Sequence, residues 1–559
     1  MRIRRSILFT LIAICILSAC SKKKDGGTTT PPPPPPANFL IKGWSVNGLP
    51  SRSLYHDISK NPVVRFSFSA PLNRSTVPGN IFLKEVSGSP VNFSITYENA
   101  DSTIVLQPSQ ALSNLNKYIV SVTDQLRSPA GGKLSAGSEI SFVTSIDSSR
   151  KFPVISDDEL LTLVQRQTFK YFWDFAHPVS GLARERNTSG ETVTSGGSGF
   201  GIMAIVVGVQ RQFITRAEGL AQLQKITTFL KTTAQRFHGA FPHWLNGTTG
   251  QVIPFSSKDN GADLVETSYL IQGLLTARQF FNGADAAETA LRNDINSIWN
   301  TVEWNWFRKN NENVLYWHWS PNYGWDMNHP IKGWNECLIT YALAASSTTF
   351  GIPKVVYDQG WASGGGMANN NNYYNIPLPL GPAYGGPLFF AHYSFLGIDP
   401  VNLTDAYANY QVQNRNHTLI NNAYVRANPK GFFGYSDSCW GLTASDVPSG
   451  YAASSPTSDI GVIAPTAALS SFPYTPAESM KALKFFYYVL GDKLWGQYGF
   501  VDAFSLHEPW FASSYLAIDQ GPIIIMIENH RTGLLWNLFM SAPEVIDGMR
   551  ALGFQGPRF

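Results

Sequence analysis

Charged residues are scarce in this sequence. Only 14% of its 559 residues are Asp, Glu, Lys or Arg, whereas roughly a quarter is typical of globular proteins. The formal net charge is +3, and no stripe of Lys and Arg interrupts the body of the chain. Because nucleic-acid-binding proteins present clustered basic surface, no nucleic-acid partner is expected.

Cysteine is equally sparse. Of four Cys, Cys15 and Cys20 lie in an N-terminal export segment, which leaves Cys337 and Cys439. Two cysteines are too few for a disulfide framework, and they lack the spacing of a metal site. One disulfide between them and two buried free thiols are both compatible with the sequence. The ten His are scattered, with no pair at ligand spacing, so no metal is predicted.

Motifs of several other chemistries are missing or incomplete. There is no phosphate loop and no zinc-protease helix motif. The run Gly199–Ala204 matches a dinucleotide fingerprint loosely, but no convincing strand precedes it. Ser198 has Gly196 before it but Phe200 two residues after it, where a nucleophile elbow needs glycine. These classes of enzyme are therefore set aside.

The apolar run near the N-terminus is too short to cross a membrane. Residues Ile7–Leu17 follow three arginines, and about eleven apolar positions fall well below the roughly 20 that a spanning helix needs. Leu17–Cys20 then reads Leu-Ser-Ala-Cys, a lipobox. We predict a lipoprotein signal peptide over residues 1–20 and acylation of Cys20, which makes the membrane a partner. A plain secretory signal is the alternative.

A Pro-rich linker is predicted over residues 21–37. Six consecutive prolines, Pro31–Pro36, favour semi-rigid polyproline II. The lysines Lys22–Lys24 replace the acidic run that many surface lipoproteins carry after the Cys. We therefore expect an outer-membrane lipoprotein, with the periplasmic face favoured over the cell surface.

Residues 38–147 have the pattern of a small β-sandwich. Short alternating runs such as Val63–Phe68, Val91–Ile95 and Tyr118–Val122 are separated by turn residues. Phe68–Asn73, together with the closing Ser141–Thr144, resembles bacterial Ig-like domains found beside exported enzymes. That resemblance implies a spacer or accessory module.

Residues 152–559 have a mostly helical pattern, separated by loops rich in Gly, Asn and aromatic residues. The longest loop is expected at about residues 360–387. Periodicity by itself supports only a mostly helical domain; we interpret it as an α/α toroid, in which paired helices form concentric rings and loops at one end build a cleft. After a first helix near Leu160–Trp173, the spacing predicts helices at Glu218–Arg236, Leu264–Phe281, Ala286–Thr301, Glu336–Ser347, Pro476–Leu490 and Pro522–Met540.

Carboxylates are the candidate catalytic groups, because hydrolysis of a glycosidic bond needs a proton donor and a carboxylate that activates water or attacks. Glu266 follows Asp263 by three residues, which is also the pattern of a helix cap closed by its own carboxylate. Glu336 precedes an apolar run and fits a helix N-terminus. Asp446 lies outside any long helical pattern, so a turn and a catalytic role are equally compatible with it. Glu185, Asp437 and Asp459 are weaker candidates, and Glu185 has arginine neighbours.

Aromatic side chains are abundant, at 13% of residues with 15 Trp and 23 Tyr. Their flat apolar faces and polar edges suit stacking on sugar rings, although core packing accounts for many of them. Leu315–Pro321 and His392–Phe395 concentrate such rings. The predicted substrate-binding set is Glu185, Trp244, Asp263, Trp317, His318, Trp319, Glu336, His392, Tyr393 and Trp440.

The helical part resembles the bacterial glucoamylase-like proteins grouped with endo-β-1,2-glucanases in glycoside hydrolase family 144. The matching segments run in order from about residue 156 to the C-terminus, which makes the resemblance far more specific than any single motif. They include Ser198–Gly201, His243–Gly247, Gly261–Glu266, Leu315–Pro321, Asn335–Glu336, Gly386–Phe389, His392–Gly397, Trp440–Asp446, Ile463–Ala467, Ala517–Pro522 and Met526–Asn529.

The resemblance implies an α/α toroid, no cofactor, and hydrolysis of β-1,2-linked glucan with inversion. By position, Glu266 matches the family's general acid, and Asp446 matches an acidic position important for activity, which makes it the candidate base. A monomer acting on an oligo- or polysaccharide is expected. Two other classes stay open: a glycan-binding lipoprotein without catalysis, and a polysaccharide lyase. The paired acidic positions favour the hydrolase, and the few Lys and Arg in the candidate loops argue against a polyanionic substrate.

Overall fold

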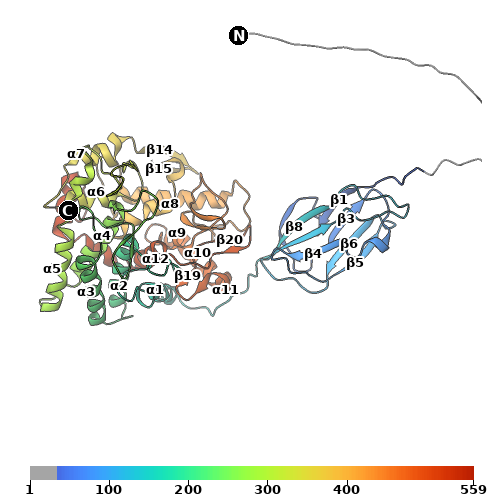
Figure 1. The fold of residues 1–559 in the computed structure, drawn as a ribbon, viewed down its shortest axis with the longest axis horizontal. Helices are drawn as coiled ribbons and strands as arrows, with labels where there is room; N and C mark the ends of the chain where they lie inside the picture. Colours follow the sequence, from blue (N-terminus) through green and yellow to red (C-terminus); the bar gives the residue numbers. More distant parts are fainter. Residues whose placement is uncertain (1–33) are drawn as a thin grey trace, which may run out of the picture.

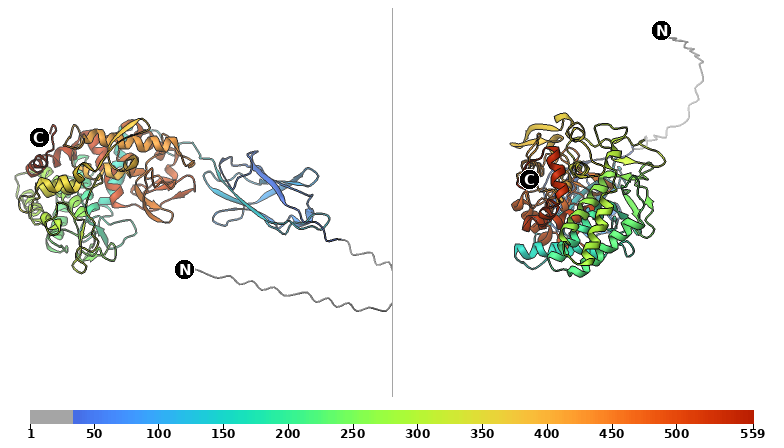
Figure 2. Two further views of the ribbon diagram at one scale, coloured as in Figure 1. Left: turned by 90° about the horizontal axis from the view of Figure 1, so that it is seen from above. Right: turned by 90° about the vertical axis from the view of Figure 1, so that its left-hand side faces the viewer.

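The computed structural model describes residues 34–559, so the predicted signal peptide, its Cys20 and most of the Pro-rich linker lie outside the described residues. A β-sandwich and a larger helical body lie end to end along the long axis (Figures 1 and 2). Among the described residues no helix is both long and apolar enough to cross a membrane.

The N-terminal body has two four-stranded sheets, ordered β1-β3-β6-β5 and β2-β8-β7-β4. All strand pairs are antiparallel except β2 with β8. Alternating side chains point inward, as in β7, and those of both sheets form one core around Phe66, Val120 and Phe142. The strands are β1 (Ile41–Val46), β2 (Leu54–Ile58), β3 (Val64–Phe68), β4 (Ile81–Glu85), β5 (Phe93–Glu98), β6 (Thr103–Pro108), β7 (Lys117–Val122) and β8 (Ser138–Thr144).

The second body is built from helices with short strands between them. Its longer helices are α1 (Asp157–Trp173), α2 (Ser195–Gln210), α3 (Arg216–Thr232), α4 (Leu264–Phe280), α5 (Ala286–Trp299), α6 (Leu338–Ser346), α8 (Tyr410–Ala427), α10 (Pro476–Lys484), α12 (Ala517–Thr532) and α14 (Pro543–Leu552). Shorter helices are α7 (Lys354–Val356), α9 (Pro465–Leu469), α11 (Gly491–Leu494) and α13 (Leu534–Phe539).

The small two- and three-stranded sheets of this body carry the loops that surround the candidate site. They are formed by β9 (Thr192–Thr194), β10 (Trp244–Asn246) and β11 (Val252–Ile253); β12 (Ala262–Asp263) and β13 (His318–Trp319); β14 (Ala368–Tyr373) and β15 (Ile376–Leu380); β16 (Ala444–Val447) and β17 (Gly450–Ala453); β18 (Trp495–Gly496) and β19 (Gly499–Phe500); and β20 (Phe504–Ser505) and β21 (Trp510–Phe511).

Helix α2 is the centre of the helical body, packed between α4 and α12. All of its residues except the last two are buried. It crosses α4 at a glycine contact: a Cβ on Gly199 would lie 2.1 Å from the backbone oxygen of Tyr269, and one on Gly273 would lie 2.2 Å from that of Gly199. This close approach brings the N-terminal ends of α2 and α4 together, and short strands β9 and β12 lead directly into them.

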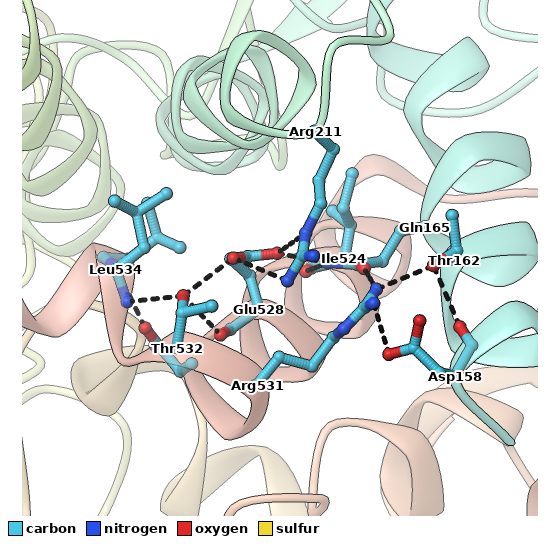
Figure 3. Close-up of polar contacts among 11 residues, drawn as sticks. Asp158, Thr162, Gln165, Arg211, Ile524, Glu528, Arg531, Thr532 and Leu534 are labelled. Carbon is cyan, nitrogen blue, oxygen red and sulfur yellow. Dashed lines mark hydrogen bonds and ion pairs between the residues drawn. The ribbon is translucent and has the colours of Figure 1, made fainter.

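A buried ion pair ties α1, α2 and α12 together at the opposite end of α2 (Figure 3). The fully buried Glu528 carboxylate accepts from Arg211 Nε at 2.7 Å and from Gln165 Nε2 at 2.9 Å. Arg531 in turn donates to Gln165 and to Asp158. Because a buried charge without a partner is strongly destabilising, this network fixes the three helices relative to one another.

Most predicted helices form, with shifted ends. The predicted helix at 522–540 is wrong as one element: α12 begins five residues earlier, and Gly533 in the left-handed region, at φ +69°, ends it before α13. Residues 476–490 divide into α10 and a π-helical turn at Phe485–Val489. The predicted loop at 360–387 contains the β14–β15 hairpin. Cys337 and Cys439 are buried free thiols, which excludes the disulfide alternative.

Candidate active site

A cavity of about 400 Å³ opens where the N-terminal ends of α2, α4 and α12 meet. Acidic and aromatic side chains line it, a combination suited to binding a sugar ring and donating a proton to a glycosidic oxygen. The lining side chains with polar or aromatic groups are Glu185, Arg186, Thr194, His243, Trp244, Phe255, Glu266, Tyr269, Trp317, Glu336, Phe389, Tyr393 and Tyr451.

Glu266 projects from the first turn of α4 toward the start of α2. Its Oε2 accepts from the backbone N–H of Gly196 at 2.7 Å and from the Thr194 hydroxyl at 3.2 Å. A Cβ at residue 196 would lie 2.5 Å from Oε2, so this contact requires glycine. The side chain is 6% exposed. Burial, with the Asp263 charge beside it, raises the pKa of Glu266 despite the nearby His243.

Asp263 caps α4, and Glu266 does not close that cap. Asp263 Oδ1 accepts from the backbone N–H groups of Val265 and Glu266 at 3.0 and 2.9 Å. Its other oxygen, Oδ2, accepts from His243 Nδ1 at 2.9 Å. Burial opposes ionisation of Asp263, but the His243 hydrogen bond and the nearby imidazoles keep its pKa below the usual value. The reciprocal capping interpretation of Glu266 is therefore wrong, because its carboxyl bonds to α2.

Glu336 lines the same cavity and is the second carboxyl group on this side. The predicted helix start at Glu336 is wrong: α6 begins at Leu338. The backbone oxygen of Glu336 accepts from the hydroxyl of Ser394, which fixes the turn. Burial raises the pKa of the Glu336 carboxyl to about 7, with contributions from the charges of Glu266 and Asp263.

Asp446 lies across the cleft on strand β16, where the β16–β17 hairpin presents it. Its carboxylate accepts from Arg186 Nη1 at 3.1 Å and from the hydroxyl of Ser514. Arg186 also pairs with Glu185 at 2.9 Å, so the predicted pairing of Glu185 with arginine is present. Asp446 faces a neighbouring cavity of about 530 Å³ that shares Arg186 and Tyr451 with the first. The two cavities therefore share a wall at Arg186 and Tyr451, and together we call them the cleft.

A buried pair of carboxyl groups lies behind Asp446. The backbone N–H of Asp446 donates to Asp502 Oδ2 at 2.6 Å, and Asp519 lies in the first turn of α12. Burial raises the pKa of Asp502 to about 7. Burial, together with repulsion from Asp502, raises the pKa of Asp519 far above its usual value. The pair therefore retains at least one proton near neutral pH.

The predicted substrate-binding residues divide into three groups. Glu185, Trp244, Trp317, Glu336 and Tyr393 line the cavity. Asp263 and His318 lie behind its wall as part of a histidine–aspartate cluster. The structure places the other three elsewhere, as packing residues: Trp319, His392 and Trp440.

The three packing residues have specific partners. Trp319 packs edge-on against His238 and Trp306. His392 is buried, with Nε2 bonded to Ser471. Trp440 is fully buried, and its indole N–H donates to a backbone oxygen of α10. Sequence alone did not separate these from cleft residues, because a satisfied core aromatic and an exposed platform use the same side chains.

Of the weaker carboxylate candidates, Glu185 lines the cavity, whereas Asp437 and Asp459 line neither cavity of the cleft. Asp437 is exposed and pairs with Lys481. Asp459 accepts from the Tyr435 hydroxyl at 2.6 Å.

Several residues at the site were missed by sequence reasoning: the cavity-lining Arg186, His243, Phe255, Tyr269 and Tyr451, and the buried Asp502 and Asp519 behind Asp446. His243 and Asp519 do lie in the segments His243–Gly247 and Ala517–Pro522 that carry the resemblance. Their position in these segments was the signal from which sequence reasoning could have identified both residues. Of the others, Tyr269 lies on α4, Tyr451 lies on β17, and Arg186, Phe255 and Asp502 lie in loops; only the fold brings these segments together.

Two protein-family models match this chain and define the class of each of its domains. The family model described as "Putative glucoamylase" matches residues 328–543, and the model described as "Bacterial Ig-like domain" matches residues 51–144. The helical body therefore has a glucoamylase-like domain, and the β-sandwich has the Ig-like fold predicted for it.

Solved structures of similar proteins relate the helical domain to particular glucoamylase-like proteins. A solved structure titled a "putative glucoamylase", from Bacteroides uniformis, has 57% identity and a TM-score of 0.72, covering 73% of this chain and 100% of that one. The endo-β-1,2-glucanase of Chitinophaga pinensis has 53% identity and a TM-score of 0.71, covering 73% and 100%.

A curated relative from Parabacteroides distasonis is named exo β-1,2-glucooligosaccharide sophorohydrolase (non-reducing end). It is 47% identical over 428 residues, which is 72% of this chain. The match spans 59% of that relative's own length. This chain belongs to the glucoamylase-like endo-β-1,2-glucanase family, with an N-terminal bacterial Ig-like domain.

Proposed function

We propose that this protein is a glycoside hydrolase that cleaves β-1,2-linked glucan with inversion of configuration. The observation that carries the proposal is the buried Glu266, whose pKa is raised, in an aromatic cavity that shares Arg186 and Tyr451 with the cavity lined by Asp446. The relatives from Chitinophaga pinensis and Parabacteroides distasonis, both named for action on β-1,2-linked glucans, support the choice of substrate.

In the proposed reaction Glu266 donates its proton to the glycosidic oxygen as the bond to the anomeric carbon breaks. A water molecule attacks that carbon from the opposite face and gives up its proton to Asp446. Arg186 and Ser514 hold the Asp446 carboxylate and stabilise its negative charge. The buried pair behind Asp446 fixes its backbone through the Asp502 hydrogen bond.

The remaining predicted substrate contacts have separate roles in this proposal. Trp244, Trp317 and Tyr393 supply faces and edges for sugar rings in the cavity. Glu185 holds Arg186, which in turn holds Asp446. Glu336, with its pKa near neutrality, bonds a sugar hydroxyl.

The domain arrangement and fold are part of the same proposal. The helical domain over 152–559 is a six-hairpin-like α/α toroid, supported by the packing of α2 with α4 and α12, of α3 with α5, and of α6 with α14. The sandwich occupies 38–147, after a signal peptide over 1–20 and a linker over 21–37. No cofactor is required.

The lipid anchor is a proposal from the lipobox. We propose acylation of Cys20 and an outer-membrane location on the periplasmic face, with the protein acting as a monomer. In detergent partitioning, the Cys20→Ala variant should move from the detergent phase to the aqueous phase. A variant that stays in the detergent phase would contradict the anchor.

One product assay tests the activity. The protein is incubated with linear β-1,2-glucan, laminarin, starch and a polyuronate. We expect products from β-1,2-glucan alone, with the new reducing end appearing first as the inverted anomer in a nuclear magnetic resonance time course. Sophorose as the sole early product would indicate exo action, and a range of oligosaccharides endo action. Binding without products would favour the glycan-binding alternative, and unsaturated products a lyase.

A further inference from the structure

Asp502 and Asp519 are buried carboxyl groups that transfer no proton in the proposed reaction. Each is 2% exposed. Asp502 lies between β19 and β20, and Asp519 lies in the first turn of α12. Gln520 holds these segments together, because its Nε2 donates to the backbone oxygen of Phe500 at 2.8 Å. The two carboxyl groups therefore lie within hydrogen-bonding reach of each other.

Three of their four oxygens lack a hydrogen-bond donor. Asp502 Oδ2 accepts from the backbone N–H of Asp446 at 2.6 Å. Asp502 Oδ1 and both oxygens of Asp519 are buried, and none of the described residues donates to them. Neither carboxyl group forms an ion pair within residues 34–559, and the nearby Arg186 pairs with Glu185 and Asp446. Buried polar groups are normally satisfied, so these oxygens indicate a proton between the two groups.

The surroundings of the pair place this proton on Asp519. Two ionised carboxylates in contact and away from water repel each other, whereas a carboxylic acid donates to a carboxylate. Asp502 already accepts from a backbone N–H, and Asp519 accepts from no group among the described residues. Burial and repulsion from Asp502 raise the pKa of Asp519 far above its usual value. Burial also raises the pKa of Asp502, but hydrogen bonds from the Asp446 backbone and from Asp519 oppose that effect.

We propose that Asp519 is a positioning residue of the active site: its protonated carboxyl group donates to the Asp502 carboxylate and thereby fixes Asp446. The inference rests on the proposed role of Asp446 as the base. Asp502 reaches that base by two routes. Its side chain accepts from the Asp446 backbone, and its backbone N–H donates at 2.9 Å to the backbone oxygen of Ser514. The hydroxyl of Ser514 in turn donates to the Asp446 carboxylate.

Two substitutions separate this hydrogen bond from the volume of the side chain. Asp519→Leu has a similar shape and no donor, so Asp502 is left unsatisfied or takes up a proton itself. A neutral carboxyl oxygen accepts more weakly than a carboxylate from the N–H of Asp446. Asp519→Asn keeps a donor, because its amide N–H can bond to Asp502 without titrating.

Infrared difference spectroscopy on the full chain tests the shared proton. At about pH 8 ordinary Asp and Glu side chains are ionised, so the carbonyl stretch of a protonated carboxyl group reports only on buried groups that retain a proton. The spectrum of the wild type minus that of Asp519→Asn should contain one such band. Asp437→Asn, on an exposed ion pair with Lys481, is the control and should give none. Absence of the band for Asp519→Asn would overturn the shared proton.

Amide hydrogen exchange, read by mass spectrometry on a peptide that contains β16, tests the link to Asp446. Loss of one hydrogen bond should speed exchange of the Asp446 N–H in Asp519→Leu by about tenfold, with exchange in α3 unchanged. Asp519→Asn should exchange as the wild type does. Equal exchange by Asp519→Leu and the wild type, or faster exchange in α3 as well, would overturn the positioning role.

Steady-state kinetics complete the test. Displacement of a base lowers turnover more than binding, so Asp519→Leu should lower kcat by about tenfold with KM changed much less. Asp519→Asn should restore most of the lost turnover. Equal losses in both variants, or a loss confined to KM, would contradict the inference. If the wild type cleaves no glycan, the proposed function fails, whereas the infrared and exchange measurements still decide whether Asp519 holds Asp446 through Asp502.

Discussion

The two sides of the cleft hold carboxyl groups in opposite environments. Glu266 accepts only from neutral donors, a backbone N–H and a hydroxyl, and its burial favours the protonated form. Asp446 accepts from a guanidinium and a hydroxyl, so one of its donors carries a positive charge. This difference in donors is the basis on which we propose Glu266 as the acid and Asp446 as the base.

Among the substitutions that test this difference between the two carboxyl groups, Glu266→Gln should have the largest effect. Removal of a general acid costs about 10²–10⁴-fold in rate, so we expect turnover on β-1,2-glucan to fall about a thousandfold. The melting temperature should change little, because the glutamine oxygen can still accept from Gly196. Steady-state kinetics and thermal unfolding on one preparation measure both.

The matched control for Glu266→Gln is Glu218→Gln. Glu218 closes the capping box at the start of α3 and lines neither cavity; because glutamine can close the same box, both melting temperature and turnover should stay close to those of the wild type. Glu336 is unsuitable as a control because it lines the same cavity. A folded and fully active Glu266→Gln enzyme would end the acid assignment.

Asp446→Asn tests the other side. The amide cannot take a proton from water, so turnover should fall about a hundredfold or more, whereas KM should change much less. Ser514→Ala, which removes one donor to Asp446, should lower turnover by only about tenfold. Asp437→Asn, on an exposed ion pair, is the control. Equal turnover by Asp446→Asn and the control would assign the base elsewhere.

Stability should also depend on pH through the buried carboxyl pair. The folded pKa of Asp502 is about 7 against an ordinary value of 3.8, so the folded chain binds more protons than the unfolded chain between these values. Stability is therefore greatest below about pH 4 for this group, falls as pH rises, and levels off above about pH 7. Glu336, also near 7, adds in the same direction.

Asp502→Asn should flatten this pH dependence. Its amide oxygen can still accept from the Asp446 backbone, but it no longer titrates. Melting temperatures of wild type and variant across pH 5–8 measure the difference. If the melting temperatures of the two proteins changed with pH in parallel, the pKa of Asp502 in the folded chain would not be raised.

The smallest effect is expected from the Ig-like domain. It touches the helical domain through the Lys117–Glu508 ion pair at 2.6 Å and through His56, which donates to the backbone oxygen of His507. Such partly exposed polar contacts contribute about 1 kcal/mol or less. Leu115 and Val143 of the sandwich also pack against the core of the helical domain, away from the two cavities. A chain beginning at Ser149 should keep turnover on soluble oligosaccharides within about twofold. Lys117→Ala serves as the milder variant. Complete loss of activity in a folded truncated protein would mean that the sandwich completes the cleft.

Sequence pattern predicted the elements whose signals are local. Alternation along Tyr118–Val122 marked strand β7, and apolar spacing with an Asp cap placed α4 within one residue of its observed end. Ends set by packing were less accurate: α12 starts at Ala517, ahead of the proline that marked its predicted start. The class of enzyme came from an ordered series of segments, each uninformative alone.

By itself the sequence determined two domains of different character, the capped start of α4, and the presence of Glu266 and Asp446. Only the tertiary structure decided which donors surround these two carboxyl groups and how deeply each is buried. The N–H of Gly196 reaches Glu266 across 70 residues, and Arg186 reaches Asp446 across 260. Protonation depends on burial and on charges within a few ångströms, and chain folding alone brings such distant residues that close.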